Sequence, residues 1–314
     1  MSNLGSSTKH SYMHNFTANL GHFMKLAKES FKNEIDVSGN FKFYPRQPKI
    51  SDIQLVAMVV LAEAEGIDSE NLLYAQVKAC HPEFYKSLPD RTNYNRRKRR
   101  LRHKIDEMAI YFSSKMTETS DKYIVDSMPI PICRIARAKR CRIMKDDLKM
   151  LPQKGYQPID KQYYFGYKIH ALTTHKGVIS SYFITQANVH DVTVAKDLSI
   201  PFIANATLIG DRGYISKQLQ LDLFDQAGIT LYTPARKNMP QSSNWKKWMG
   251  GIRKRIETVF SQQCDQFLIK RNYAKSFDGL FARITAKLCA FTMLQYTNYQ
   301  ANRPIGLVKH ALLF

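Results

Sequence analysis

Apolar residues in the first third of the chain recur at helical spacing. Ser51 begins a helix whose broad apolar stripe ends before Gly66. The stripe consists of Ile53, Leu55, Val56, Val59, Val60 and Ala64. Further helices are predicted over 70–80 and 96–111, the last of them basic on one side. A helix, a turn and a basic helix permit a helix-turn-helix-like DNA module, although a merely structural helical domain fits these residues equally well.

The pattern changes near residue 120 to short apolar and alternating runs. The predicted strands are 123–126, 163–174, 178–185, 206–211 and 229–233. The predicted helices are 192–198, 216–226, 252–270 and 280–296. Three leading strands followed by alternating helices and strands predict an α/β fold with one mixed sheet and helices on its faces. We therefore divide the chain into a helical domain, 1–118, and an α/β domain, 119–314, with a basic loop at 134–161.

Composition restricts the class of protein. Hydrophobic residues make up 44% of the 314, with 17 Phe and 17 Tyr, which is enough for a folded core. No apolar run reaches the roughly 18 residues of a membrane span, and the N-terminal segment has no signal-peptide pattern. Five cysteines without a CxxC pair are typical of a reducing compartment. We expect a soluble cytoplasmic protein.

Charge is concentrated in three blocks. The chain has 47 Lys+Arg against 26 Asp+Glu, a formal charge of +21. Residues 91–104, 134–145 and 235–255 hold eight, six and seven basic residues and no acid, so the rest of the chain is neutral. One such block could be a solvated helix face, but three together favour a nucleic acid. A membrane surface is the weaker alternative, because no block has a strong apolar face. The residues predicted to contact DNA are Arg96, Arg97, Arg99, Arg100, Arg137, Lys139, Arg140, Lys246, Lys247 and Lys254.

Two acidic residues follow predicted strands. Asp126 ends the first strand and Asp211 ends the strand after helix 192–198. Strand ends of an α/β sheet meet at one edge, where two carboxylates repel each other unless a cation lies between them. Mg²⁺ suits such a pair, and Glu257 on the helix at 252–270 would complete a two-metal site for phosphodiester chemistry. The plain alternatives are a turn or cap role for a single aspartate, and a surface pair between Glu257 and Arg253.

Three strings resemble the catalytic blocks of DDE transposases from bacterial insertion sequences. They are Val125-Asp126-Ser127, Gly210-Asp211-Arg212-Gly213-Tyr214 and Arg255-Ile256-Glu257-Thr258-Val259-Phe260-Ser261. The segments DSMPIPICRIARAKRC and YYFGYKIHALTTHKGVISSYFITQANVHD are most similar to the insertion-sequence 982 family, and the resemblance extends over the whole chain. It implies an RNase H-like catalytic fold with Asp126, Asp211 and Glu257 as catalytic and metal-binding triad.

The chain departs from one signature of related transposases, a Tyr-Arg-Glu-Lys pattern on the last catalytic helix. Arg253 stands at the Arg position, but Gly250 and Cys264 occupy the Tyr and Lys positions. We expect other side chains to take the stacking and phosphate-binding roles. The candidates are Trp245 or Trp248, and Lys254 or Lys270.

Supporting residues follow from the same resemblance. His190 and Asp191 match a His-Asp pair beside the active centre, so either could orient a metal-bound water or contact phosphate, while Asp191 could equally begin a helix. Lys168 and His170 share a strand face, for which a solvated or packing role is favoured. Cys133 and Cys141 lack a second His/Cys pair, so a zinc site is not expected.

The resemblance implies a transposase that binds the terminal inverted repeats of its element, cleaves DNA by metal-dependent hydrolysis and joins the 3′ ends to target DNA. The implied cofactor is Mg²⁺, with Mn²⁺ as substitute, at two ions per active site. The implied partners are double-stranded DNA and a second copy of the chain, in the nucleoid of a bacterial cytoplasm. The alternatives are a nuclease of the same fold that joins nothing, and a DNA-binding protein derived from a transposase that has lost catalysis.

Overall fold

The chain forms two compact units, each described here by itself. The computed structural model describes residues 15–158, 161–235, 243–271 and 273–312. The helical unit consists of 1–112, 266–273 and 282–314, and the α/β unit consists of 113–265 and 274–281. The C-terminal residues from 282 on, which the sequence pattern groups with the α/β domain, therefore belong to the helical unit. No helix in the described ranges has the length and apolar character needed to cross a bilayer.

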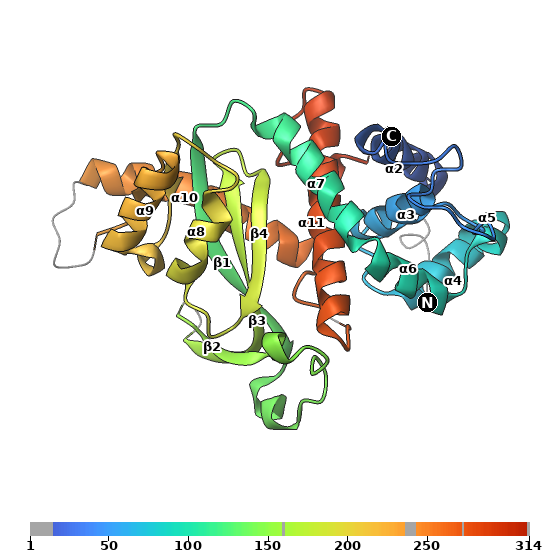
Figure 1. The fold of residues 1–314 in the computed structure, drawn as a ribbon, viewed down its shortest axis with the longest axis horizontal. Coiled ribbons are helices and arrows are strands. Elements are labelled where there is room, and N and C mark those ends of the chain that lie inside the picture. The colour runs from blue at the N-terminus through green and yellow to red at the C-terminus, as the bar shows by residue number, and fades with distance from the viewer. Residues whose placement is uncertain (1–14, 159–160, 236–242, 272, 313–314) are drawn as a thin grey trace, which may run out of the picture. The chain divides into compact units, whose positions relative to one another are not determined.

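The helical unit, whose helices are drawn in Figure 1, is built around a helix that is buried along most of its length. Its helices are α2 (Phe16–Ser30), α3 (Asp52–Ala64), α4 (Glu70–Cys80), α5 (Pro82–Ser87), α6 (Arg91–Arg100), α7 (Arg102–Thr117) and α11 (Phe277–Gln300), of which α7 and α11 each continue into the α/β unit. The predicted start of α3 is confirmed, because the Ser51 side chain accepts from Gln54 N and the Gln54 side chain accepts from Ser51 N. Every residue from Asp52 to Glu63 except Gln54 is buried, so α3 is the centre of this core.

Charged side chains inside the helical unit neutralise one another. Lys287 on α11 donates to Glu63 on α3 at 2.6 Å, and these two side chains are 2% and 4% exposed. Lys98 on α6 lies 3.5 Å from Glu63 and 3.3 Å from Glu70, and Arg283 also pairs with Glu70. A buried charge is tolerated only when it is paired, so this network joins α3, α4 and α6 to α11.

The α/β unit contains a mixed sheet. Its strands are β1 (Lys122–Cys133), β2 (Gln153–Gln157), β3 (Gln162–Thr174), β4 (Ile179–Gln186), β5 (Thr207–Ile209) and β6 (Thr230–Tyr232). The order is β2-β3-β1-β5-β6, and β4 also pairs with β3. β1 is antiparallel to β3 and parallel to β5, so the predicted mixed sheet is confirmed.

Helices cover both faces of this sheet (Figure 1). On one face, α8 (Asp191–Ser199) and α9 (Lys217–Ala227) form a core with side chains that include Val125 and Leu172. On the other face, α10 (Ser243–Asp265) places Ile256 against Ile124 and Ala171. Successive residues of β1 therefore alternate between the two helical layers, as a strand buried on both faces requires.

Two expectations about the segment after Asp126 are wrong. Asp126 does not end its strand, because β1 continues to Cys133, and the predicted basic loop contains β2 in addition to short 3₁₀ turns, η2 (Ile135–Arg140) and η3 (Leu148–Met150). Pro129 and Pro131 suggest a break, but β1 pairs with β5 only as far as Ile124. Beyond that point one edge of β1 has no strand partner, and proline is tolerated on such an edge.

Candidate active site

The register of the sheet places two acidic residues side by side. Ile124 on β1 pairs with Ile209 on β5, and each strand reaches an aspartate two residues later, at Asp126 and Asp211. Asp211 begins a short 3₁₀ turn, η4 (Arg212–Tyr214), in which its Oδ1 accepts from Gly213 N at 2.7 Å. Asp126 within β1 and Asp211 just after β5 therefore lie near each other, close enough for the charge of Asp211 to raise the pKa of Asp126.

A third carboxylate belongs to the same group. Asp191 is the first residue of α8, and its Oδ1 accepts from Ser127 Oγ at 3.0 Å and from Lys168 Nζ at 2.9 Å. A Cβ on Gly213 would lie 2.9 Å from Asp211 Oδ1 and 3.4 Å from Asp191 Oδ2. A larger residue at this position would therefore require the Asp211 carboxylate to shift.

Burial makes Asp126 difficult to ionise. Its side chain is 18% exposed, and burial raises the pKa of Asp126 to about 7, with further increases from Asp211 and Asp191. A hydrogen bond from Ser127 N and the nearby Arg253 guanidinium act in the opposite direction. The carboxylates outweigh the positive charge beside them, so this edge of the sheet favours a cation.

The acidic residue predicted on α10 has no described contact with this group. Arg253 is on the sheet side of α10, with Nη2 3.8 Å from Asp126 Oδ2. Glu257 is one helical turn further along, and it is exposed. The structure describes no contact of Glu257 with Asp126 or Asp211, so its place in the triad stays a prediction.

The residues present fit a divalent cation that retains water. In the part of the chain that the structure describes, no three ligand side chains surround a single point. Mg²⁺ is commonly held by one or two carboxylates, with waters and substrate phosphate as its other ligands. Asp126 and Asp211 supply such a pair, and a bound cation would offset the burial that raises the pKa of Asp126.

Three neighbours of the acids received no catalytic assignment from the sequence. Lys168 contacts Asp191 and Val189 O, so its role is not solvation. Ser127 bonds Asp191, and the hydroxyl of Tyr214 is buried without a hydrogen-bond partner. Strand alternation places Ser127 on the face opposite Asp126, and the approach of α8 that brings Asp191 to Ser127 and Lys168 has no local signal.

The two residues of the predicted His-Asp pair have different surroundings. His190 is exposed at the position before α8 and makes no capping bond with its side chain. Asp191 lies 3.6 Å from the ring of buried His170, whose pKa is lowered to about 4 by burial, so that ring is neutral at pH 7. Of the two predicted residues, Asp191 is the one that contacts the surroundings of Asp126.

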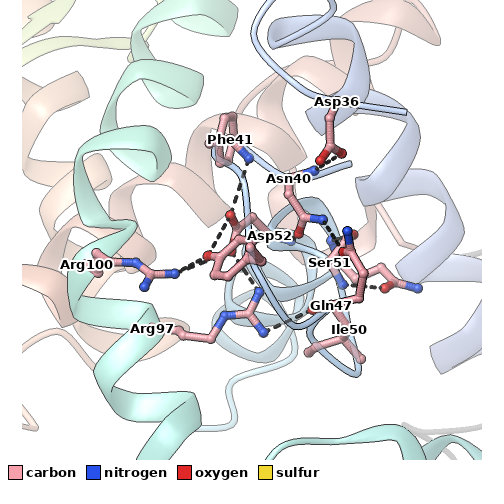
Figure 2. A network of polar contacts seen from close by, with 11 residues as sticks. Asp36, Asn40, Phe41, Gln47, Ile50, Ser51, Asp52, Arg97 and Arg100 are labelled. Atoms are coloured by element: carbon pink, nitrogen blue, oxygen red, sulfur yellow. Dashed lines mark hydrogen bonds and ion pairs between the residues drawn. The ribbon is translucent and has the colours of Figure 1, made fainter. Parts of the chain in front are cut away.

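The basic residues of α6 fall into two groups (Figure 2). Arg97 is buried and donates to Ile50 O at 3.0 Å and to Asp52 Oδ1 at 2.7 Å. Arg100 contacts Tyr44 and lies 3.8 Å from the same carboxylate, with 42% of its side chain exposed. Arg96 and Arg99 are exposed. Arg97 therefore has a structural role in this unit, whereas the other three arginines remain candidates for DNA contact.

The other predicted DNA contacts are exposed wherever the structure describes them. Arg137, Lys139 and Arg140 are exposed on η2, and Lys247 and Lys254 are exposed on α10. The Lys246 side chain lies outside the described residues, as does that of Trp245, while Trp248 packs edge-on against Tyr232. The described members of this set can all reach a polyanion.

Removing the Arg96 and Arg99 side chains together is expected to weaken DNA binding and to reduce its salt dependence. Each lost phosphate contact lowers the slope of log K against log salt by about 0.9. Binding isotherms at several salt concentrations measure this slope. Arg97→Ala serves as the contrast, because it should lower the stability of the helical unit by leaving Asp52 with fewer partners. An unchanged slope in the double variant would mark these arginines as a solvated helix face.

The free energy of unfolding of the metal-free protein is expected to fall as the pH rises from about 4 to about 7. The pKa of Asp126 is 3.8 when unperturbed and about 7 in the fold, so the folded state holds a proton that the unfolded state has lost. The cost of ionising Asp126 is fully present above pH 7 and is on the order of 4 kcal/mol. Glu65, whose pKa burial also raises to about 7, contributes in the same range.

Urea unfolding of wild type and Asp126→Asn at a series of pH values separates the two contributions. The part due to Asp126 should disappear in the variant, and Mg²⁺ should restore stability to wild type at pH 8. Parallel pH curves for the two proteins would show that Asp126 ionises without cost.

The fold and the paired aspartates define a sheet-edge site suited to metal-dependent chemistry on phosphate esters. A family model described as "Transposase DDE domain" matches residues 116–276, just over half of the chain. The chain therefore belongs to the family of DDE transposases. Curated proteins include no match to this sequence. Solved structures include none either.

Proposed function

We propose that the protein is the transposase of an insertion sequence, resembling the insertion-sequence 982 family. It binds the inverted repeats at the ends of its element, cleaves there and joins the freed 3′ ends to target DNA. The observation that supports this proposal is that Asp126 and Asp211, each two residues after the paired Ile124 and Ile209, interact electrostatically in a member of the DDE transposase family. The sheet, with β3 antiparallel and β5 parallel to the central β1, supports an RNase H-like catalytic domain.

The reaction requires two phosphoryl transfers. In the first, water attacks the phosphorus at the element end, and the P–O3′ bond breaks to leave a 3′-hydroxyl and a 5′-phosphate. In the second, that 3′-oxygen attacks a phosphorus of target DNA and displaces the target's own 3′-oxygen. Divalent ions, when bound, activate the attacking oxygen and stabilise the leaving oxygen.

The protein's residues hold and neutralise this site. Asp126 and Asp211 supply the anionic ligands, and Glu257 is the proposed third. Asp191 holds Lys168 and Ser127 behind them. Arg253 lies near Asp126 and supplies positive charge on the side facing α10, where a phosphate would approach. The basic residues of α6, η2 and α10 bind the DNA backbone.

The test uses end-labelled duplex from the DNA flanking the gene, Mg²⁺ and a supercoiled plasmid. Wild type should produce a metal-dependent nick at each 3′ end and labelled DNA joined to plasmid, and Asp211→Asn should produce neither. Nicking without joining would support a nuclease. Binding without either product would contradict catalysis and support a DNA-binding protein derived from a transposase.

A further inference from the structure

An exposed pair of tyrosines lies on the hairpin of β2 and β3. Tyr156 and Tyr163 are directly opposite each other across the two strands, with ring centroids 5.0 Å apart. They are 49% and 56% exposed, although aromatic side chains are normally buried. The Lys154 ammonium lies 4.2 Å from the centroid of the Tyr163 ring. We call these three residues the tyrosine–lysine patch.

The patch shares a sheet face with the acid on β1. Asp126 pairs with Ala171 on β3, and directly paired residues of antiparallel strands have their side chains on the same face. Alternation along β3 then places Tyr163 on the face of Ala171. Eight residues of strand separate these two positions, about 26 Å at a rise of about 3.3 Å per residue.

The surroundings of the patch are basic. The 3₁₀ turn η2, with Arg137, Lys139 and Arg140 exposed, packs against β3. Figure 1 shows β2 and the start of β3 at the end of the sheet that adjoins this basic segment. The positive charge favours a polyanion as the binding partner. The exposed tyrosine rings favour a polyanion with flat apolar groups on which they can stack, as nucleic-acid bases are.

We propose that the tyrosine–lysine patch binds unpaired DNA bases beside the cleavage site. Bases inside a duplex are stacked on one another, so exposed rings can stack only on single-stranded or unwound bases. Lys154 holds the adjacent phosphate. The separation of about 26 Å corresponds to at most roughly eight nucleotides at the stacked-strand spacing of about 3.4 Å, because an unstacked strand extends further per nucleotide. This inference rests on the proposed function, which supplies the DNA substrate. It adds a second contact between protein and DNA, made with the flanking DNA at a distance from the cleavage site.

A purely structural role for the two tyrosines is also physically reasonable, because cross-strand aromatic pairs stabilise hairpins. That role predicts no dependence of DNA affinity on the rings once the fold is intact. Threonine has high strand propensity and no ring, so Tyr156→Thr with Tyr163→Thr removes stacking while retaining a strand-forming residue. Phenylalanine at both positions retains the rings and controls for the hydroxyls.

The experiment compares two DNA ends without divalent metal, one with a single-stranded flank of 3 nucleotides and one with a flank of 10. Wild type and the double Phe variant should bind the longer flank about tenfold more tightly, as expected for one or two stacked bases. The double Thr variant should lose this gain and bind both ends equally. Phe224→Ala, which removes an exposed ring from α9 in the same unit, should retain the gain.

A second measurement does not depend on variants. Iodouracil placed at successive flank positions should crosslink to the peptide of β2 or β3 within about eight nucleotides of the cleavage site. Equal binding of the two flanks by wild type, or an undiminished gain in the double Thr variant, would overturn the inference.

Failure of the proposed function would be seen separately, as absence of nicking and joining. Ring-dependent flank binding in a protein that does not cleave would leave the surface as a single-strand binding site and remove the transposase proposal. Cleavage and joining without ring-dependent binding would support the transposase proposal and overturn the inference about the tyrosine–lysine patch.

Discussion

Asp126→Asn is expected to abolish DNA cleavage and at the same time to stabilise the metal-free protein. In the proposed function Asp126 is one of two carboxylates that hold the metal, so its loss removes several kcal/mol of transition-state stabilisation, roughly a thousandfold in rate. The same change removes a carboxylate whose pKa is raised to about 7 by burial and by Asp211 and Asp191. Asparagine keeps the shape of the side chain without its charge, so the melting temperature at pH 8 should rise.

Single-turnover nicking and thermal unfolding without metal measure the two effects. Asp225→Asn, at an exposed position of α9, is the matched control and should change neither. DNA affinity should stay near wild type, because the basic residues are untouched. A variant that still nicks would remove Asp126 from the catalytic site, and a destabilised variant would show that its carboxylate makes a favourable contact in the fold.

Glu63→Gln is expected to lower the free energy of unfolding of the helical unit by about 3–5 kcal/mol. The change leaves Lys287, only 2% exposed, with Phe267 O as a partner and without its carboxylate. Removal of one member of a buried ion pair strands the other charge in a low-dielectric interior. Urea unfolding, together with hydrogen exchange of the α3 amides, measures the loss.

A second variant distinguishes the charge effect from a packing effect. Replacing Glu63 by Gln and Lys287 by Met together should recover much of the lost stability, because no unpaired charge remains. Glu83→Gln breaks an exposed pair with Lys86 and should cost less than about 1 kcal/mol. A loss of that small size for Glu63→Gln would show that Lys287 reaches solvent or another acceptor.

The local pattern of apolar and polar residues was sufficient to predict most of the helices and strands. The apolar stripe and Ser51 predicted α3, and alternating runs predicted β3 and β4 with their turn at Gly177. The end of the apolar run at Asp126 gave the wrong end of β1, which continues through two prolines to Cys133 because proline is tolerated on a strand edge that has no partner. β2 has no apolar alternation of its own, so the pattern did not mark it as a strand, although it forms a hairpin with the neighbouring β3.

The nearness of two of the predicted acids could be inferred from the sequence, but their surroundings could not. Asp126 and Asp211 follow from the strands that precede them, because the sheet register brings these positions together. Arg97 belongs to a basic run like its neighbours, and only the fold turns it toward Asp52. The positions of Lys168, Asp191 and Glu257 relative to one another depend on how α8 and α10 pack, which sequence spacing does not specify.

The helical unit takes its core from segments at opposite ends of the sequence. On the ribosome, α3 and α6 emerge about two hundred residues before Lys287 and Arg283 of α11. Until then Glu63 and Glu70 share the single ammonium of Lys98. The α/β residues therefore leave the ribosome before the helical unit can complete its core. A nascent chain that stops anywhere before α11 lacks Arg283 and Lys287, so the charges of Glu63 and Glu70 are not fully paired and burying them is unfavourable.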